Sequence, residues 1–316
     1  MFAARGIAIS LSVFFLVYCA LSLAVSCSWR RVWLYCQRYS VRRVADWLFA
    51  LRMFPLLTAA IITAAFTVPS FLLLEPRSID EPIGEVPLAL GLCGAALGIV
   101  GVLNAVLAFR KASRTISAWT REAYPIETTA PVPVLRISRT LPAMTAAGII
   151  HPKVLLSTAA EFVLTPNELH TALNHELEHV RRYDNLKKLL LRLVAFPGMA
   201  GLETAWLEAT EMAADDAAVS SAGEALDLAA ALIKLSRLGP VAAPVDLTAA
   251  LVHSPASAMN ARVERLVAWS DERRVPLQKR SHWYGVGAAL ATVAVFAVTY
   301  SQLLVRLHTA TEWLVR

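Results

Sequence analysis

Four stretches of the chain are apolar throughout and carry no charged side chain. They are Gly6 to Cys27, Phe54 to Leu74, Val86 to Phe109 and Tyr284 to Val305. A helix needs about 20 predominantly apolar residues to cross the hydrocarbon core of a bilayer. Each stretch reaches that length, so the pattern predicts four membrane-spanning helices. The first stretch is longer than the apolar region of a signal peptide and no small-residue cleavage site follows it, which favours a helix that is retained.

The segment between the third and fourth apolar stretches mixes polar and apolar residues and predicts a folded domain. Val132 to Ser138 and Lys153 to Ser157 are short runs of mainly aliphatic residues, which predict two strands. Proline and glycine residues between them predict a loop, and the proline-containing stretch Tyr124 to Pro133 predicts an irregular connector.

A helix with a complete start signal follows the second strand. Thr165 can accept hydrogen bonds from free amide groups, Pro166 stands where no N–H is needed, and Glu168 lies three residues after the cap. This capping box predicts a helix that ends at about Leu186. The stretch Leu189 to Trp206 is apolar but interrupted by charged residues and a proline, so we interpret it as a buried or interfacial hairpin.

The predicted helix contains the sequence His175-Glu176-Leu177-Glu178-His179. Two histidines four residues apart project from one face of a helix, so both imidazoles can bind one ion. Glu176 can then reach a water molecule held on that ion. The spacing therefore predicts a zinc site with Glu176 as the general base; the alternative is a helix whose His and Glu side chains are only solvated.

A catalytic zinc ion usually takes three protein ligands, so a third must come from elsewhere in the chain. The stretch from Glu208 to Asp216 is acidic and rich in alanine, which predicts a helix with Glu211 and Asp215 on one face. One carboxylate can bind the ion while the other hydrogen-bonds a ligating imidazole. On spacing alone, a solvated acidic face is an equal alternative.

Composition and charge favour a membrane protein. Hydrophobic residues make up 57% of the chain and charged residues 17%, and the mean hydropathy is +0.53. Soluble domains have about 45–50% apolar and about 25% charged residues. The net charge of +6 arises from basic residues beside the apolar stretches, where they orient membrane helices, so we expect no nucleic-acid partner.

The distribution of Lys and Arg predicts the orientation in the membrane. The loop after the first apolar stretch is rich in arginine, whereas the loop after the second is acidic. Cytoplasmic loops carry the excess of Lys and Arg. We therefore expect an external amino terminus, a membrane domain over residues 1–109, a cytoplasmic domain over 110–282, and a fourth helix with a short external tail over 283–316.

Four segments of the predicted cytoplasmic domain carry a family resemblance. They are Gly148-Ile-Ile-His-Pro-Lys-Val-Leu-Leu-Ser157, Leu164-Thr-Pro-Asn-Glu-Leu169, His175-Glu-Leu-Glu-His-Val-Arg-Arg-Tyr-Asp-Asn185 and Glu211-Met-Ala-Ala-Asp215. Together they resemble the membrane metallopeptidases of β-lactam and methicillin-resistance signalling, whose relatives are the heat-shock protease HtpX and the CaaX prenyl proteases. The receptor members continue into a penicillin-binding sensor, whereas this sequence stops at Arg316, so the resemblance supports a peptidase and puts antibiotic sensing in doubt.

The resemblance implies a mainly α-helical polytopic membrane protein with four transmembrane helices and a cytoplasmic α+β zincin-like metallopeptidase domain. It makes Glu211 the third zinc ligand and Asp215 the closing residue of the family's second motif. His253-Ser-Pro255, followed by Arg262-Val-Glu-Arg-Leu266, is similar to a further element of the HtpX and CaaX relatives. That similarity implies that Arg262 stabilises the oxyanion, although an amphipathic helix without chemistry explains the same residues.

These features predict a zinc endopeptidase in a bacterial-type cytoplasmic membrane, cleaving a repressor or itself at the cytoplasmic face in regulatory proteolysis. We expect the substrate peptide to add to the edge of the strand formed by Lys153, Val154, Leu155, Leu156 and Ser157. Expected partners are a protein or peptide substrate in the cytoplasm or membrane, a separate sensor protein and the lipid bilayer. The alternatives are membrane-protein quality control of the HtpX type and a catalytically silent signalling adaptor.

Overall fold

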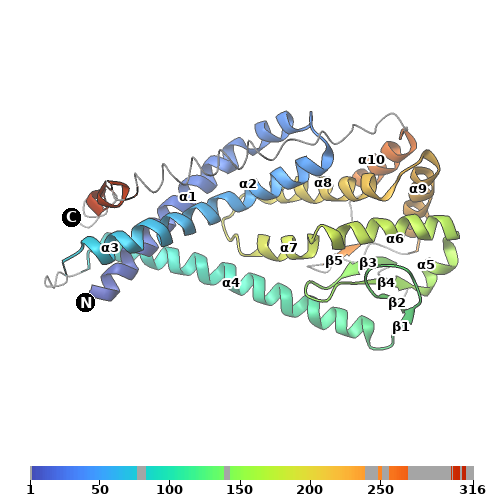
Figure 1. Ribbon diagram of the computed structural model, residues 1–316, viewed down its shortest axis with the longest axis horizontal. Helices are drawn as coiled ribbons and strands as arrows, with labels where there is room; N and C mark the ends of the chain where they lie inside the picture. The colour runs from blue at the N-terminus through green and yellow to red at the C-terminus, as the bar shows by residue number, and fades with distance from the viewer. Residues whose placement is uncertain are drawn as a thin grey trace. The chain divides into compact units, whose positions relative to one another are not determined.

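The computed structural model describes residues 2–76, 83–138, 143–238, 248–250, 256–269, 300, 302–306 and 308–310 (Figure 1). The chain forms two compact units, each built from separate parts of the sequence. The first unit contains Met1–Ser28, Met53–Val100 and Val275–Arg316, and the second contains Trp29–Arg52 and Gly101–Arg274.

Three helical stretches are long and apolar enough to cross a membrane. They are α1 (Phe2–Cys36), the continuous stretch Val41–Leu74, and α4 (Glu85–Thr120). The middle stretch consists of α2 (Val41–Ile62), the π-helical turn η1 (Thr63–Thr67) and α3 (Val68–Leu74). The first three predicted membrane helices are therefore confirmed as long apolar helices. The fourth, Tyr284 to Val305, lies mostly outside the described residues, although Tyr300 and residues 302–305 are helical.

In the first unit, glycines allow close packing of α1 and α4. A Cβ atom added at Gly91 would lie 2.9 Å from the carbonyl oxygen of Ala8, and one at Gly94 would lie 2.5 Å from that of Leu11. Small residues let two membrane helices approach until their backbones touch. The sequence of α4 is thus suited to this contact.

The second unit contains a sheet of five strands in the order β1-β2-β4-β3-β5. The strands are β1 (Tyr124–Ile126), β2 (Val134–Ile137), β3 (Met144–Ala147), β4 (Lys153–Ser157) and β5 (Thr248–Ala250). β2 and β4 pair in parallel, and the other neighbours are antiparallel. The two predicted strands are found as β2 and β4. The segments predicted as a connector and a loop contain β1 and β3, because pairing with neighbouring strands makes strands of sequences with little strand propensity of their own.

The prediction that a substrate adds to the edge of Lys153–Ser157 is wrong. β4 lies inside the sheet, with β2 on one side and β3 on the other. Its backbone N–H and C=O groups are used by these two neighbours, so β4 offers no free edge.

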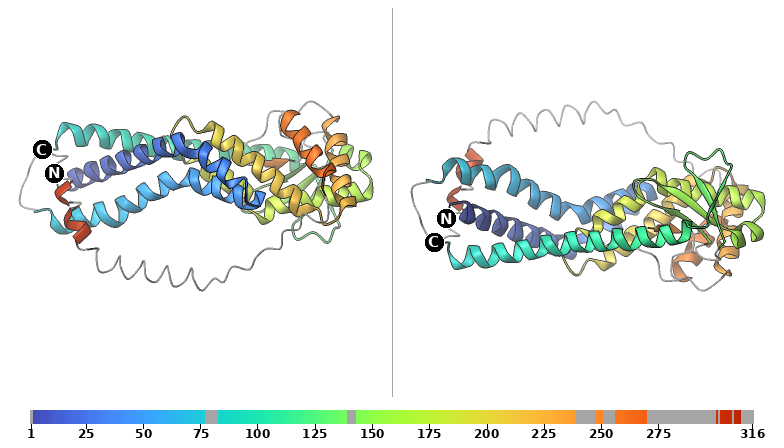
Figure 2. Two further views of the ribbon diagram at one scale, coloured as in Figure 1. Left: turned by 90° about the horizontal axis from the view of Figure 1, so that it is seen from above. Right: turned by 90° about the horizontal axis from the view of Figure 1, so that it is seen from below.

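Among the described residues, six helices lie wholly within the second unit, which also contains parts of α1, α2 and α4. They are α5 (Thr158–Val163), α6 (Pro166–Arg181), α7 (Asp184–Arg192), α8 (Ala200–Ala218), α9 (Ala222–Ser236) and α10 (Ala256–Val267). α6 packs against β3 and β4 on one side and against α8 and α9 on the other, and α10 packs on α9 and α8 (Figure 2). The core between α6, α9 and the sheet contains Val154, Leu156, Leu177, Leu228 and Leu232. This packing holds α6 at the centre of the unit.

α6 begins as predicted and ends earlier than predicted. The Thr165 hydroxyl accepts from the Glu168 N–H (3.3 Å) and the Glu168 carboxylate accepts from the Thr165 N–H (2.8 Å), which completes the capping box. The helix stops at Arg181 because Tyr183 adopts a left-handed conformation, with φ 56° and ψ 38°. A new helix, α7, starts at the next residue.

The stretch Leu189 to Trp206, predicted as a hairpin, comprises the end of α7, the connection 193–199 and the start of α8, and Arg52 of α2 binds it. The Arg52 guanidinium, whose side chain is 5% exposed, donates to the Glu203 carboxylate (3.0 Å) and to the carbonyl oxygen of Val194 (3.0 Å). Its third nitrogen points at the sulfur of Met199 (3.1 Å). One buried side chain thereby holds both ends of the connection that leads into α8.

Candidate metal centre

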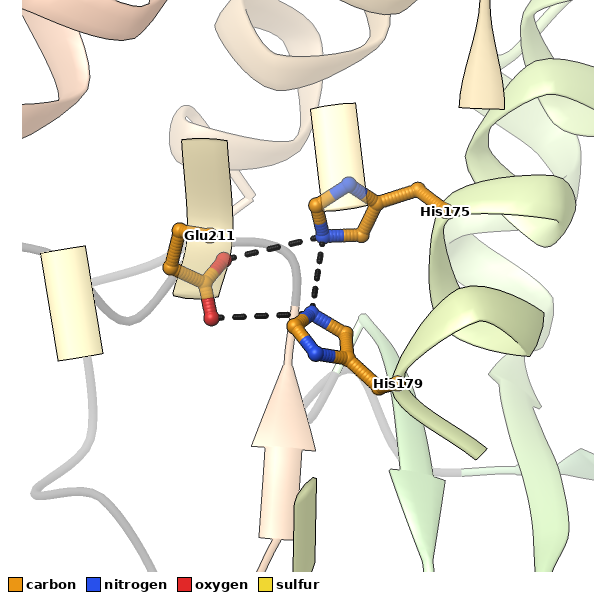
Figure 3. A group of neighbouring side chains, drawn as sticks. All are labelled: His175, His179 and Glu211. Atoms are coloured by element: carbon orange, nitrogen blue, oxygen red, sulfur yellow. Dashed lines mark hydrogen bonds and ion pairs between the residues drawn. The ribbon is translucent and has the colours of Figure 1, made fainter. Parts of the chain in front are cut away.

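His175, His179 and Glu211 meet at one point between α6 and α8. The two histidines project from the same face of α6, and the carboxylate of Glu211 approaches them from α8 (Figure 3). His175 and His179 are buried, with exposed fractions of 0% and 2%. The structure thus brings together the three predicted metal ligands, from positions up to 36 residues apart in the sequence.

The spacing of the ligand atoms fits a zinc ion. The two Nε2 atoms are 3.1 Å apart, and the Glu211 oxygens lie 3.6 Å from His175 Nε2 and 3.6 Å from His179 Nε2. A tetrahedral zinc ion with bonds of about 2.0–2.1 Å separates its ligand atoms by about 3.3 Å. The chemistry fits as well, because imidazole nitrogen and carboxylate oxygen are common zinc ligands.

Each imidazole is oriented by a buried carboxylate on its other nitrogen. His175 Nδ1 lies 2.9 Å from Asp215 Oδ1, and His179 Nδ1 lies 2.8 Å from Asp184 Oδ2. Both carboxylates are fully buried. A carboxylate at Nδ1 fixes the ring orientation and makes Nε2 the better ligand atom. The structure therefore supplies both histidines with the partner that metal-binding histidines usually have.

The ionisation of the metal-free site follows from these contacts. Burial alone lowers the pKa of His175, but its contacts with the carboxylates of Asp215 and Glu211 outweigh this effect and raise the pKa to about 9. Burial raises the pKa of Glu211, but the electrostatic interactions with His179 and Arg262 outweigh this effect and lower the pKa to about 2. The metal-free centre thus holds a protonated His175 beside an ionised Glu211 at neutral pH.

Glu176 lies next to the ligands and keeps one carboxylate oxygen unused. Its Oε2 accepts from the backbone N–H of Ala146 in β3 (2.6 Å). Its Oε1 is buried and has no hydrogen-bond partner in the part of the chain that the structure describes. Burial raises the pKa of Glu176, and the charges of His179 and His175 act against that rise. A carboxyl group with a raised pKa and an unused oxygen is suited to accept a proton.

Arg262 of α10 binds the carboxylates behind the ligands. Its Nε and Nη2 atoms donate to the two oxygens of Asp215 (2.7 and 2.6 Å), and Nη1 lies 3.1 Å from Glu211 Oε2. The charge of Arg262 overcomes the effect of burial and keeps the pKa of Asp215 well below its usual range. Arg262 is therefore part of the centre, in contact with two acidic residues.

Two further charged residues at the centre were not assigned a role from the sequence. Asp184 orients His179 and also lies near Lys187 (3.7 Å) and Arg182 (3.9 Å). Lys188 follows it by one helical turn, and burial lowers its pKa while the charges of Glu211, Asp184 and Glu176 oppose the change. The sequence offered one signal for this role of Asp184, namely an acidic residue five positions after the second histidine. Whether that residue can contact His179 depends on the turn at Tyr183.

The remaining predicted site residues lie elsewhere or outside the description. Lys153 to Ser157 form the central strand β4, on the far side of β3 from β5. His253 and Pro255 lie outside the described residues.

Comparison with known proteins identifies no family for this chain, so the evidence for the site is the structure. No protein-family model matches the chain, and no curated protein matches it significantly. The structure itself defines a candidate zinc site, made of an H-E-x-x-H helix and a glutamate, in a chain with three candidate membrane spans.

Proposed function

We propose that this protein is a membrane-bound zinc endopeptidase that hydrolyses peptide bonds at the cytoplasmic face of a bacterial-type membrane. The observation that carries the proposal is the position of Glu176, which lies buried near His175, His179 and Glu211 and has one carboxylate oxygen without a hydrogen-bond partner among the described residues. A site that only stored metal would have no need of such a group next to its ligands.

The chain's own residues have the following roles. His175, His179 and Glu211 would hold the zinc ion, which when bound supplies a Lewis acid that polarises the scissile carbonyl and lowers the pKa of water. Glu176 takes a proton from the water molecule whose oxygen attacks the carbonyl carbon. When the C–N bond breaks, Glu176 delivers this proton to the leaving amine nitrogen.

The carboxylates and Arg262 keep this arrangement in place. Asp215 and Asp184 orient the two imidazoles, and Arg262 binds Asp215 and Glu211. These contacts favour a positioning role for Arg262, since its guanidinium is already bound to two carboxylates. The oxyanion role implied by the family resemblance stays a prediction for Arg262.

The substrate peptide would pair with β3 on the side that faces away from β4, in the place that β5 occupies in this structure. β3 contacts the metal-bearing helix α6, and its Ala146 N–H binds Glu176. β5 pairs antiparallel with β3 on this side, which supports the idea that an extended chain can bind here. A substrate in this position would lie next to the proposed base, and a segment of the chain itself is one such substrate.

The regulatory part of the proposal concerns the substrate. A cytosolic repressor or the protein itself would be cleaved, and a separate membrane protein would act as the sensor. The family resemblance of the H-E-x-x-H and E-x-x-A-D motifs supports this role. Proteomic comparison of membranes and cytosol with active and Glu176→Gln protein tests it, because a regulatory protease should process one or few proteins, whereas quality control should process many membrane proteins.

The peptidase itself is tested with the full chain, purified in detergent and loaded with zinc, using labelled β-casein as the substrate. We expect Glu176→Gln to keep its zinc and to lose cleavage by about 10²–10⁴-fold, the usual contribution of a general base. Glu178→Gln is the matched control, since Glu178 belongs to the same motif but pairs with Arg181. Cleavage by Glu176→Gln at the wild-type rate would refute the proposal, and loss of zinc from this variant would refute the assigned role of Glu176.

A further inference from the structure

We propose that Asn185 binds the peptide substrate: its side-chain amide nitrogen holds the edge of β3, and its Oδ1 accepts a backbone N–H of the bound peptide. This inference rests on the proposed function, since it names the group that recognises the substrate at the same site. It also defines the class of ligand, an extended peptide recognised through its main chain.

Asn185 connects α7 to the edge of β3. Its Nδ2 donates to the carbonyl oxygens of Ala146 (3.0 Å) and Gly148 (3.2 Å). Both partners are acceptors, so the amide nitrogen must face them and the amide oxygen must face another direction. The residue directly follows Asp184, which orients His179, so the same turn of α7 serves the metal centre and β3.

The oxygen of this side chain has no hydrogen-bond partner among the residues that the structure describes. Asn185 is 7% exposed, and within the described ranges its Oδ1 is buried and makes no hydrogen bond. A buried acceptor without a donor costs free energy, and most buried polar atoms in native proteins have a partner. An unpaired acceptor beside a candidate active site is explained if a bound ligand supplies the hydrogen-bond donor.

The register of β3 places Asn185 and Glu176 on the edge that a peptide would use. The N–H of Ser157 in β4 donates to the carbonyl oxygen of Ala143, and the register then pairs Ala146 with Val154. Since hydrogen-bonded positions alternate along an antiparallel pair, the N–H and C=O of Ala146 point away from β4. This N–H binds Glu176 and this C=O binds Asn185.

A chain that lies along this edge therefore passes the proposed base and Asn185 together. β5 occupies the edge, with Ala249 opposite Ala146, and α7 contacts β5. A substrate peptide in the place of β5 has backbone N–H groups within reach of the turn of α7 that carries Asn185. The Ala146 carbonyl has two lone pairs, so it can keep its bond to Nδ2 and still accept an N–H from the peptide.

The test replaces single backbone N–H groups of the substrate by ester oxygens. The probes are peptides that span the main cleavage site in β-casein, each with one ester bond at a different position. At one position we expect the ester to raise the KM of the zinc-loaded wild type roughly 3- to 10-fold, the range for one neutral hydrogen bond. The same ester should have no effect on Asn185→Leu, which lacks the acceptor and whose KM for the unmodified peptide is already raised by a similar factor.

Matched variants separate this role from a structural one. Asn174→Leu, on the outer side of α6 where Asn174 contacts His170, should keep the ester effect of the wild type. If Asn185→Leu fails to fold, Asn185→Ser replaces it, because the hydroxyl can still donate to a β3 carbonyl while Oδ1 is gone. An ester effect of equal size in wild type and in the Asn185 variant would overturn the inference.

Binding of the same peptides to zinc-loaded Glu176→Gln, measured by fluorescence anisotropy, separates the inference from the proposed function. Binding that depends on Asn185 and on one N–H, without any cleavage by the wild type, would refute the peptidase and support the role of Asn185. Cleavage without such dependence would refute the role of Asn185 alone. The absence of both binding and cleavage would refute both.

Discussion

The substitution Asp215→Asn tests whether the residues behind the metal ligands hold the centre together. Asp215 is fully buried and accepts from Arg262 at 2.7 and 2.6 Å, and its Oδ1 lies 2.9 Å from His175 Nδ1. Asparagine has nearly the same shape, so the substitution removes the charge and leaves the volume unchanged. Arg262 would then keep only Glu211 as a partner of opposite charge among its contacts described above.

The size of the effect follows from two separate losses. Breaking a buried ion pair by removing one partner costs about 3–5 kcal/mol of folding free energy. Removing the carboxylate behind a ligating histidine weakens metal binding about 10- to 100-fold, or about 1.4–2.7 kcal/mol. We therefore expect Asp215→Asn to lower both the unfolding midpoint of the metal-free protein and its affinity for zinc.

Thermal unfolding in detergent and zinc titration against a chelator measure the two losses. Asp216→Asn is the matched control, because Asp216 is the next residue and pairs with Arg265 at a partly exposed position. Its cost should stay below about 1 kcal/mol. In the double variant Asp215→Asn/Arg262→Met, the stability loss should be smaller than the sum of the single losses. Wild-type zinc affinity in Asp215→Asn would refute the reasoning.

Two further predictions concern pH and the connection between α7 and α8. Since the pKa of His175 is raised from 6.5 to about 9, its protonated form contributes stability to the metal-free protein that is complete below pH 6.5 and lost as the pH rises through about 9. Zinc must displace that proton, so its affinity should rise about tenfold per pH unit below pH 9, and a flat titration series would contradict this reading. Arg52→Met should lower the free energy of unfolding by about 3 kcal/mol or more, since Glu203 and the Val194 carbonyl lose the hydrogen bonds that Arg52 donates. The control Arg43→Met, on the exposed side of α2, should change it by less than about 0.5 kcal/mol in the same unfolding assay, and equal losses would refute the role of Arg52.

Features that depend only on residues close together in the sequence could be predicted from it. The start of α6 was predictable because Thr165, Pro166 and Glu168 form a complete cap within four positions. The pairing of His175 with His179 was predictable because helical geometry alone puts them on one face. The first three long apolar helices followed from the length and hydropathy of their segments.

Features that depend on distant contacts could not be predicted. Nothing near Tyr183 in the sequence announces a left-handed residue, so the end of α6 was placed too late. β3 was missed because Met144-Thr-Ala-Ala147 becomes a strand only through pairing with β4 and β5. The same pairing makes β4 a central strand, which is why the predicted substrate edge was wrong.

In the candidate site, too, local spacing predicted part of the arrangement and distant contacts decided the rest. Spacing offered Glu211 and Asp215 as a ligand and a supporting carboxylate, and left open whether the acidic face was only solvated. The packing of α8 against α6 brings both residues to the histidines, and the position of α10 pairs Arg262 with them. Such choices are made by tertiary packing, which a local pattern does not contain.

The most direct test of the account is the zinc content of the purified full chain, measured for wild type, Glu211→Ala and the control Glu208→Ala. Glu208 lies on the same helix as Glu211 but is not one of the three grouped ligands. The account predicts one zinc ion per chain in wild type and in Glu208→Ala, and a marked loss of zinc in Glu211→Ala. A wild-type protein that binds no zinc, or a Glu211→Ala protein that keeps all of it, would contradict the proposed centre.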